Sequence, residues 1–241
     1  MEVINDLLGY DGLKIVQNPE MFSFSIDSMI LGYFATINKK MNNIVDFCTG
    51  NAPIPLYLTL RTKAHITGIE IQKKVYELGV KSVKMNNKDN QITLLNEDLK
   101  GVSSRIKEKV DLITCNPPFF KLNESSNINK SEYKTIARHE VKITLEECVY
   151  EASKLLSTGG YFAMVHRPDR LAEILEVMKK YKLEPKRLQF IYPKIDSEPN
   201  HILIECVKDG NPGLKVLKPL IVYENGVWSK EILKIYNLKE E

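Results

Sequence analysis

Four consecutive residues, Asn116, Pro117, Pro118 and Phe119, have the clearest chemical potential in this chain, and they directly follow the apolar run 110–115. That run has the composition of a buried strand. Each proline fixes its own φ near about −65° and favours an extended conformation in the residue before it. We therefore expect Asn116 to be held at the carboxyl end of a strand, with its amide directed into the crevice where open α/β sheets bind ligands. A plain strand-terminating turn is the alternative, because prolines are common in turns.

The turn after an earlier predicted strand also has the features of a ligand site. The segment from Asp46 to Ala52 connects that strand with a helix, and Gly50 lets a ligand approach the backbone closely. The full glycine fingerprint of a dinucleotide site is absent, because positions 48 and 52 are Cys and Ala. A phosphate-binding loop would need more glycine, whereas a cofactor without phosphate groups can tolerate this turn.

Two acidic residues follow the next two predicted strands. Glu70 ends the second strand, 20 residues after Gly50, where a carboxylate can accept hydrogen bonds from both ribose hydroxyls. Asp98 follows the third strand and is placed to meet the exocyclic amine of an adenine. Taken singly, Glu70 could be a solvated strand end and Asp46 a buried cap. Their order along one βαβ series, ending at Asn116, predicts a nucleoside cofactor whose reactive end lies beside the fourth strand.

Strands and helices alternate along most of the chain, which predicts an α/β fold with a parallel sheet and right-handed crossovers. The expected strands are 44–48, 66–70, 92–95, 110–115 and 161–166. The expected helices are 53–60, 75–86, 144–156, opened by a capping box and stopped by Gly159-Gly160, and one from 168. Strands 188–192 and 202–207 have no helix between them, which predicts an antiparallel pair at the sheet edge.

The first 38 residues lack the regular alternation of strands and helices that the rest of the chain shows. Residues 1–38 are expected to form an N-terminal extension packed on the core, with a strand at 13–17 and a helix from Ile26 to Phe34. Residues 39–241 are expected to form the main domain. Its tail is expected to contain a strand at 219–223, a turn at Asn225-Gly226 and a final helix.

Composition adds a few limits. With 241 residues and 43% hydrophobic content, the chain can form one α/β domain with a full core. The net charge of +3 permits a nucleic-acid partner without arguing for one. The four cysteines and four histidines lack metal-site spacing, so we expect buried cysteines in a reducing compartment. No apolar run has membrane length. The expectation is a cytoplasmic protein without a metal, a membrane or an obligate protein partner.

These residues resemble those of the S-adenosylmethionine-dependent amino-methyltransferases. The run from Asn116 to Phe119 looks like their Asn/Asp-Pro-Pro-aromatic motif, which marks methylation of a planar amino nitrogen of adenine, guanine, cytosine or glutamine. The segments 22–28, 46–55 and 137–140, with His166-Arg167, narrow the resemblance to the bacterial tRNA1(Val) adenine-37 N6-methyltransferase family. The resemblance covers essentially the whole chain. Cys48 departs from it, because the family commonly has glycine there.

The resemblance implies a Rossmann-like methyltransferase fold, with a seven-stranded, mostly parallel sheet, an antiparallel edge strand and helices on both faces. S-adenosylmethionine is the implied cofactor. The implied catalytic residues are Asn116, Pro117, Pro118 and Phe119. The first two accept the hydrogens of the target amino group, and Phe119 stacks on the base. The implied cofactor contacts are Phe24, Asp27, Asp46, Cys48, Thr49, Gly50, Asn51, Glu70, Ile71, Asp98 and Asn116.

The resemblance further implies methyl transfer to N6 of an adenine in the anticodon loop of a tRNA. The implied RNA contacts are Lys121, Lys134, Arg138, His139 and Arg167. The loop 121–142 carries a net charge of +2, five basic minus three acidic residues, so both an RNA lid and a solvated polar loop remain open.

Other functions stay open at this point. Adenine in ribosomal RNA or DNA, or a protein glutamine, would use the same chemistry, although the segment 22–28 argues against glutamine. A non-catalytic RNA-binding protein that keeps only the fold is the alternative from another class. A nicotinamide dehydrogenase is disfavoured by the missing glycines and by the absence of a plausible hydride-transfer His or Lys.

Overall fold

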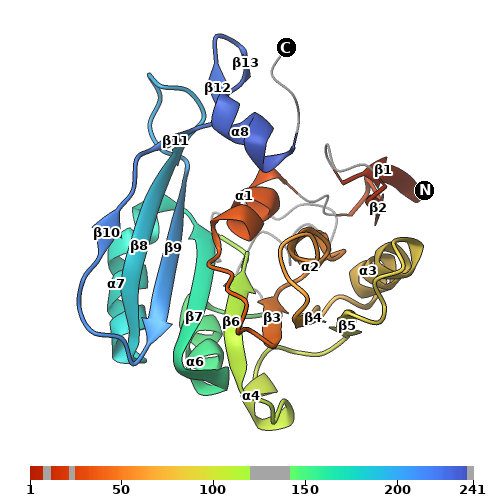
Figure 1. Cartoon of the computed structure of the whole chain (residues 1–241), viewed down its shortest axis with the longest axis horizontal. Helices are drawn as coiled ribbons and strands as arrows, with labels where there is room; N and C mark the ends of the chain where they lie inside the picture. The colour runs from red at the N-terminus through yellow and green to blue at the C-terminus, as the bar shows by residue number, and fades with distance from the viewer. Residues whose placement is uncertain (8–11, 22–24, 120–141, 238–241) are drawn as a thin grey trace.

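A nine-stranded sheet forms the centre of the computed structural model, which describes residues 1–7, 12–21, 25–119 and 142–237 (Figure 1). Its seven main strands follow the order β5–β4–β3–β6–β7–β9–β8, and the short strands β10 and β11 pair with β8. The strands are β3 (Asn43–Phe47), β4 (His65–Ile69), β5 (Ile92–Leu95), β6 (Val110–Cys115), β7 (Leu156–His166), β8 (Leu183–Tyr192), β9 (His201–Lys208), β10 (Lys215–Val216) and β11 (Leu220–Ile221). The predicted seven-stranded, mostly parallel sheet is therefore confirmed, with two short additions.

The strand order creates a crevice in the middle of the sheet. β3 lies between β4 and β6 and runs parallel to both. The chain passes from β3 to β4 and β5, and then returns to β6 on the other side of β3. Ligands of open α/β sheets bind where the order reverses in this way. Phe47 lies opposite Cys115, so the next residues, Cys48 and Asn116, leave the sheet at the same level.

The predicted antiparallel pair is also confirmed, and its place in the sheet is now defined. β9 runs antiparallel to both of its neighbours and lies between β7 and β8. The edge is formed by β8 with its two short partners, so the antiparallel strand itself lies one place further in. Because no helix lies between them in the sequence, β8 and β9 could be predicted to pair. The sequence does not indicate on which side of β8 the strand β9 lies.

Helices cover both faces of the sheet, as predicted. The helices are α1 (Ile26–Phe34), α2 (Pro53–Leu58), α3 (Lys73–Met85), α4 (Val102–Arg105), α6 (Leu145–Leu155), α7 (Leu171–Lys180), which follows the 3-10 turn Pro168–Arg170, and α8 (Lys230–Ile235). One hydrophobic core contains residues of α1, α2 and α8, and the other contains residues of α4, α6 and α7. Two local predictions are confirmed, because Pro53 opens α2, and Thr144 forms the capping box of α6 with Glu147.

The expected helix stop at Gly159 and Gly160 is wrong. α6 has already ended, and β7 runs through both glycines. A Cβ atom on Gly160 would lie 2.9 Å from the Ser157 carbonyl oxygen and 3.1 Å from that of Val110. The glycine therefore permits a close approach of backbones where the pairing of β6 with β7 shifts its register.

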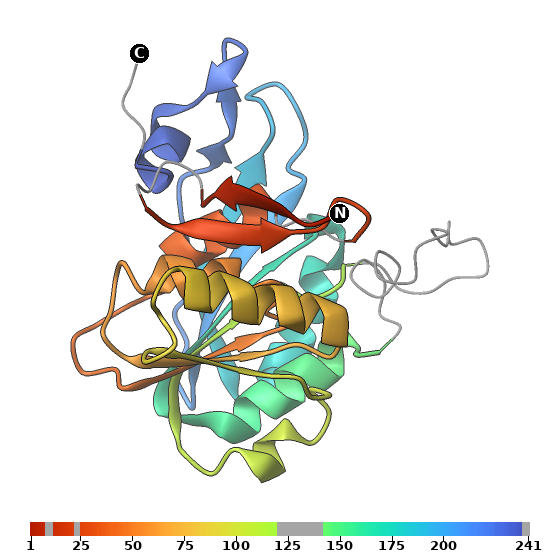
Figure 2. The same cartoon turned by 90° about the vertical axis from the view of Figure 1, so that its right-hand side faces the viewer.

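The first strands form a hairpin across α3, which Figure 2 shows in side view. It consists of β1 (Val3–Asp6), which the sequence did not predict, and the predicted β2 (Lys14–Gln17). The backbone N–H of Val16 donates to Ser82 Oγ at 2.9 Å, and Asn86 Nδ2 donates to the Lys14 carbonyl at 2.6 Å. Asn51 Nδ2 donates to the Val16 carbonyl at 2.8 Å, which ties the hairpin to the turn after β3 as well.

The end of the chain follows the prediction in its turn and its final helix, whereas the strand predicted at 219–223 is divided into β11 and a second short strand. A hairpin of β12 (Tyr223–Glu224) and β13 (Val227–Trp228) surrounds the turn at Asn225-Gly226, and α8 is the expected final helix. The ring of Tyr236 stacks on that of Trp228, with centroids 4.9 Å apart. Within the described ranges, every helix is too short or too polar to traverse a lipid bilayer.

A buried carboxylate joins the end of α1 to the antiparallel strands. Glu205 on β9 is 1% exposed, and it accepts hydrogen bonds from Arg187 Nη1 at 2.8 Å and from the Thr36 N–H and hydroxyl, each at 2.7 Å. Loss of the carboxylate would remove the acceptor that the Thr36 N–H and the Arg187 guanidinium share, although Arg187 also donates to Thr36 Oγ1 and to the Phe34 carbonyl.

We expect Glu205→Ala to lower the free energy of unfolding by about 3 kcal/mol, because Arg187 and Thr36 lose their shared acceptor. Urea denaturation followed by circular dichroism measures this change. Glu176 is exposed on α7 and provides the control. Glu176→Ala should change the free energy by less than about 0.5 kcal/mol. Equal effects of the two substitutions would contradict the role of the buried pair.

Candidate active site

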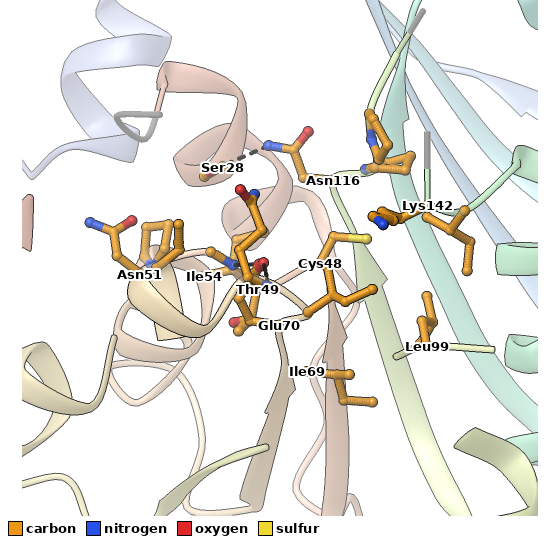
Figure 3. A pocket seen from close by; sticks show the side chains of 18 of the residues that line it. Ser28, Cys48, Thr49, Asn51, Ile54, Ile69, Glu70, Leu99, Asn116 and Lys142 are labelled. Carbon is orange, nitrogen blue, oxygen red and sulfur yellow. Dashed lines mark hydrogen bonds between the residues drawn. The ribbon is translucent and has the colours of Figure 1, made fainter. Parts of the chain in front are cut away.

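A cavity of about 260 Å³ opens at the carboxyl ends of β3, β4, β5 and β6, beside the first turn of α1 (Figure 3). The predicted site residues that line it are Asp27, Cys48, Thr49, Gly50, Asn51, Glu70, Ile71, Asp98, Asn116, Pro117, Pro118 and Phe119. The strand order thus brings the separate predicted segments into one place.

The turn after β3 has a glycine-like backbone with only one glycine. Cys48, Gly50 and Ala52 all have positive φ angles, of 56°, 59° and 70°. A non-glycine residue in this conformation costs roughly 1–2 kcal/mol, so the surrounding fold must impose it. The space over Gly50 is open, because a Cβ atom there would meet no atom within 4 Å. The backbone at Gly50 is therefore open to a ligand.

Asp46 lies beneath this turn and does not line the cavity. Its side chain is completely buried, and it accepts hydrogen bonds from Thr49 Oγ1 and Thr114 Oγ1, each at 2.6 Å. Burial raises the pKa of the Asp46 carboxyl to about 7, against the opposing hydrogen bonds from Thr114 and Thr49. Asp46 is therefore not placed for the predicted direct contact with a cofactor. It instead links the turn after β3 to β6 through these two hydrogen bonds.

Glu70 lines the cavity and shapes it at the same time. Its two oxygens accept hydrogen bonds from the Gly50 N–H at 3.0 Å and from the Gln72 N–H at 2.8 Å. Burial raises the pKa of the Glu70 carboxyl to about 7, against the hydrogen bond from the Gln72 backbone. Each carboxylate oxygen has a further lone pair. Glu70 can therefore hold the turn and still accept hydrogen bonds from a ligand.

Asn116 stands at the end of β6, facing the first turn of α1. Its Nδ2 donates to Ser28 Oγ at 3.2 Å, and Figure 3 shows its oxygen on the opposite side of the amide. The hydroxyl of Ser28 therefore orients the amide, and Oδ1 is the atom that can accept from a substrate. Pro117 and Pro118 continue the cavity wall from there.

Phe119 closes the wall against two imidazole rings. Its ring centroid lies 5.5 Å from that of His166 and 5.3 Å from that of His201. Burial lowers the pKa of His166 to about 3, so this imidazole is neutral at physiological pH. His201 Nδ1 lies 3.5 Å from Asp27 Oδ1, and that carboxylate also accepts from Ser25 Oγ at 2.7 Å. The aromatic wall and the first turn of α1 are thereby connected.

Besides Asp46, six predicted site residues are not among the described residues that line the cavity. Phe24, Lys121, Lys134, Arg138 and His139 lie outside the described residues. Arg167 follows β7 without lining the cavity, and its Nε lies 3.8 Å from Asp169 Oδ1.

Sequence reasoning also missed part of the lining. The missed residues are Ser25, Ser28, Pro53, Ile54, Ile69, Gln72, Val75, Glu97, Leu99, Lys142 and Ile143. Leu99 could have been found from the sequence. It directly follows Asp98, and an apolar side chain there can cover the adenine ring whose amino group Asp98 is expected to bind. The remaining contacts depend on how α1 and the residues before α6 pack, which no local pattern in the sequence describes.

The lining defines the kind of ligand that fits. Four carboxyl side chains, those of Asp27, Glu70, Glu97 and Asp98, favour a ligand with hydroxyl and amino groups and positive charge. Apolar side chains such as Ile71 provide surfaces for a planar ring. A nucleoside cofactor with a cationic centre has these properties.

Comparisons with known proteins agree with this geometry. Residues 12–184 match the methyltransferase small domain family. The chain is 30% identical over 207 residues to the tRNA1(Val) (adenine(37)-N6)-methyltransferase of Porphyromonas gingivalis strain ATCC 33277, covering 83% of this chain and 80% of the relative. It is 24% identical over 223 residues to the protein of that name from Flavobacteriaceae bacterium strain 3519-10, covering 91% and 92%.

Solved structures show the same fold. A predicted O-methyltransferase from Agrobacterium tumefaciens has a TM-score of 0.69 at 18% identity, covering 88% of this chain and 95% of that chain. Geranyl diphosphate C-methyltransferase from Streptomyces coelicolor, solved with S-adenosyl-L-homocysteine, has a TM-score of 0.56 at 12% identity, covering 75% and 79%. At these identities the similarity concerns the fold alone.

The raised pKa of Asp46 has a consequence for stability. Between about pH 4 and 7, the unfolded chain ionises this carboxyl while the folded protein keeps it protonated. Unfolding releases a proton in this window, so Asp46 makes the folded state less stable as the pH rises through it.

We therefore expect Asp46→Asn to gain stability relative to the natural chain as the pH rises from about 5 to 7, by roughly 1 kcal/mol per pH unit. Urea denaturation across this pH range measures the difference. Asp89→Asn, at an exposed position, is the control and should show no such trend. A constant difference for Asp46→Asn would show that the carboxyl is already ionised in the folded protein.

Proposed function

Because this chain belongs to the methyltransferase small domain family, and within it to the tRNA1(Val) (adenine(37)-N6)-methyltransferases, we propose that it methylates N6 of an adenine in tRNA, using S-adenosylmethionine. The proposed position is adenine-37, beside the anticodon of tRNA1(Val). The observation that carries the proposal is the Asn116 amide, which Ser28 orients in the wall of a cavity whose acidic lining fits this cofactor.

The cofactor would be held by residues from three strand ends. Glu70 would accept hydrogen bonds from the ribose hydroxyls, and Asp98 would accept from the adenine amine, with Leu99 and Ile71 beside the ring. The open backbone at Gly50 leaves room for the nucleoside. When bound, S-adenosylmethionine supplies a methyl group activated by its sulfonium charge.

The residues at the end of β6 would act on the substrate amine. An adenine amino group is a poor nucleophile, because its lone pair is delocalised into the ring. Asn116 Oδ1 and the Pro117 carbonyl would accept its two hydrogens, which localises the lone pair on nitrogen and directs it towards the methyl group. The proton can leave to solvent after methylation. Most of the rate would come from this alignment, which can supply roughly 7–11 kcal/mol.

Phe119 would hold the base in place. Stacking of a base on an aromatic side chain contributes about 1–3 kcal/mol. The neutral ring of His166 and the ring of His201 support Phe119 from the protein side. The adenine has to leave its stack to reach this wall, which is easier in an RNA loop than in a duplex. Contacts to RNA by Arg167 and by the basic residues between 121 and 139 remain predictions.

The substrate can be tested directly. The protein is incubated with labelled S-adenosylmethionine and, separately, with unmodified total tRNA, ribosomal RNA, DNA and protein extract, and the products are located by mass spectrometry. We expect N6-methyladenine in tRNA, at position 37 of tRNA1(Val). Methylation of only ribosomal RNA, DNA or protein would assign the alternative substrate, and no N6-methyladenine in any nucleic acid would contradict the proposal.

The role of Asn116 predicts a graded set of variants. Asn116→Ala should reduce the rate of methyl transfer by about 10²–10³-fold, the usual effect of losing one positioned polar group. Asn116→Asp keeps an acceptor oxygen and should retain more activity. Ser28→Ala removes only the orienting contact and should have a smaller effect than Asn116→Ala. Full activity in Asn116→Ala, measured with saturating tRNA, would exclude this mechanism.

A further inference from the structure

Three thiols from three different elements meet at the cofactor cavity. Cys48 follows β3, Cys115 ends β6, and Cys148 lies in α6, and their Sγ atoms all lie within 4.8 Å of one another. Cys115 and Cys148 are buried, whereas Cys48 is half-buried and lines the cavity. Figure 3 shows the Cys48 side chain between Glu70 and Lys142. The three cysteines are separated by 67 and 33 residues in the sequence. This spacing does not match a metal-binding motif, so the sequence did not predict the cluster.

The fold explains why they converge. Cys115 is the register partner of Phe47, so Cys48 begins the turn one residue beyond the last paired level of β3 and β6. α6 packs in the same hydrophobic core as these strand ends and contributes Cys148. The cluster is therefore built on a strand end, a strand-to-helix turn and a helix that are each fixed by packing.

We propose that Cys48, Cys115 and Cys148 form a binding site for a zinc-group cation, Zn²⁺ or Cd²⁺, and that occupation of this site opposes cofactor binding. Thiolates are preferred ligands of such soft cations. A zinc–sulfur bond of about 2.3 Å places two ligands of a tetrahedral ion about 3.8 Å apart, so the sulfurs need to approach by at most about 1 Å. On binding, each S–H bond breaks and its proton passes to solvent, while three sulfur–metal bonds form without any change of oxidation state.

The position of Cys48 connects the site with the cavity. Three protein ligands leave the fourth position of a tetrahedral ion free, and Cys48 is the ligand that borders open space. Cys48 precedes the turn at Gly50 that S-adenosylmethionine would approach, and Cys115 precedes Asn116. An ion here would fill and rearrange the space between the turn and the end of β6. By linkage, the cofactor would weaken ion binding by the same factor. This second part of the inference rests on the proposed function.

Ion binding is tested on the full-length, reduced and metal-free protein by titration with Cd²⁺. We expect one ion per chain by native mass spectrometry, and an ultraviolet sulfur-to-cadmium charge-transfer band that saturates at one equivalent. Cadmium NMR of the natural chain should report three thiolate ligands, which needs no variant that might misfold. A spectrum of an ion without thiolate ligands, or no band at stoichiometric Cd²⁺, would overturn the site.

Single alanine variants identify the ligands. Cys48→Ala, Cys115→Ala and Cys148→Ala should each weaken Cd²⁺ binding at least tenfold, with folding checked by circular dichroism. Cys206 is the matched control, because it is as buried as Cys115 and Cys148 but its sulfur lies 3.1 Å from Met178 Sδ, outside the three-thiol cluster. Cys206→Ala should bind Cd²⁺ like the natural chain. An equal loss in Cys206→Ala would overturn the assignment.

Competition is measured separately, with S-adenosylhomocysteine as the probe. One equivalent of Cd²⁺ should weaken its binding at least tenfold in the natural chain and not in Cys148→Ala. Unchanged affinity would overturn the antagonism. Failure of the proposed methyl transfer is distinguishable, because it would leave the charge-transfer band unaffected.

Discussion

The buried carboxyl group of Asp46 determines how the two halves of the site are placed. One oxygen accepts from Thr49 in the turn after β3, and the other accepts from Thr114 near the end of β6. A carboxyl group without water around it is costly unless it is hydrogen-bonded, so both hydroxyls are required. The turn that would carry the cofactor and the strand end that carries Asn116 are therefore held in one mutual arrangement.

The backbone of the turn depends on this support. Cys48 and Ala52 hold left-handed conformations that favour glycine, and both lie within or beside the segment that Asp46 and Glu70 hold. The local sequence opposes the conformation, and the hydrogen bonds and packing around it impose it. A turn of this shape can thus persist in a sequence that lacks the expected glycines.

Much of the fold could be predicted because its signals are local. The alternation of apolar strands with helices, the capping box at Thr144 and the prolines after Asn116 each report a local backbone preference. The same holds for the site residues at strand ends, such as Glu70 and Asp98. The insertion of β9 between β7 and β8 and the path of β7 through Gly160 depend on neighbours distant in sequence, and were not predicted.

The parts of the site that were not predicted also depend on contacts between residues that are distant in the sequence. Ser28 meets Asn116 only because α1 crosses the strand ends, and His201 meets Phe119 only because β9 lies next to β7. The role of Asp46 changed for the same reason, since its partner Thr114 lies on another strand. The cluster of three thiols is the part of the site that was hardest to predict. Each cysteine taken alone has the character of a small apolar residue, and only the fold brings the three together.

The hairpin at the start of the chain has a consequence for how the protein folds as it is synthesised. Lys14 exchanges hydrogen bonds with Asn86, which lies 72 residues later in the chain. At a synthesis rate of ~5–20 residues per second, the hairpin waits roughly 4–14 s for this partner. Asn51, which donates a hydrogen bond to Val16, is synthesised before Asn86. It belongs, however, to the turn after β3, which is held in place through the hydrogen bond between Asp46 and Thr114 on β6. The two strands of the hairpin are thus synthesised well before the residues on which they dock.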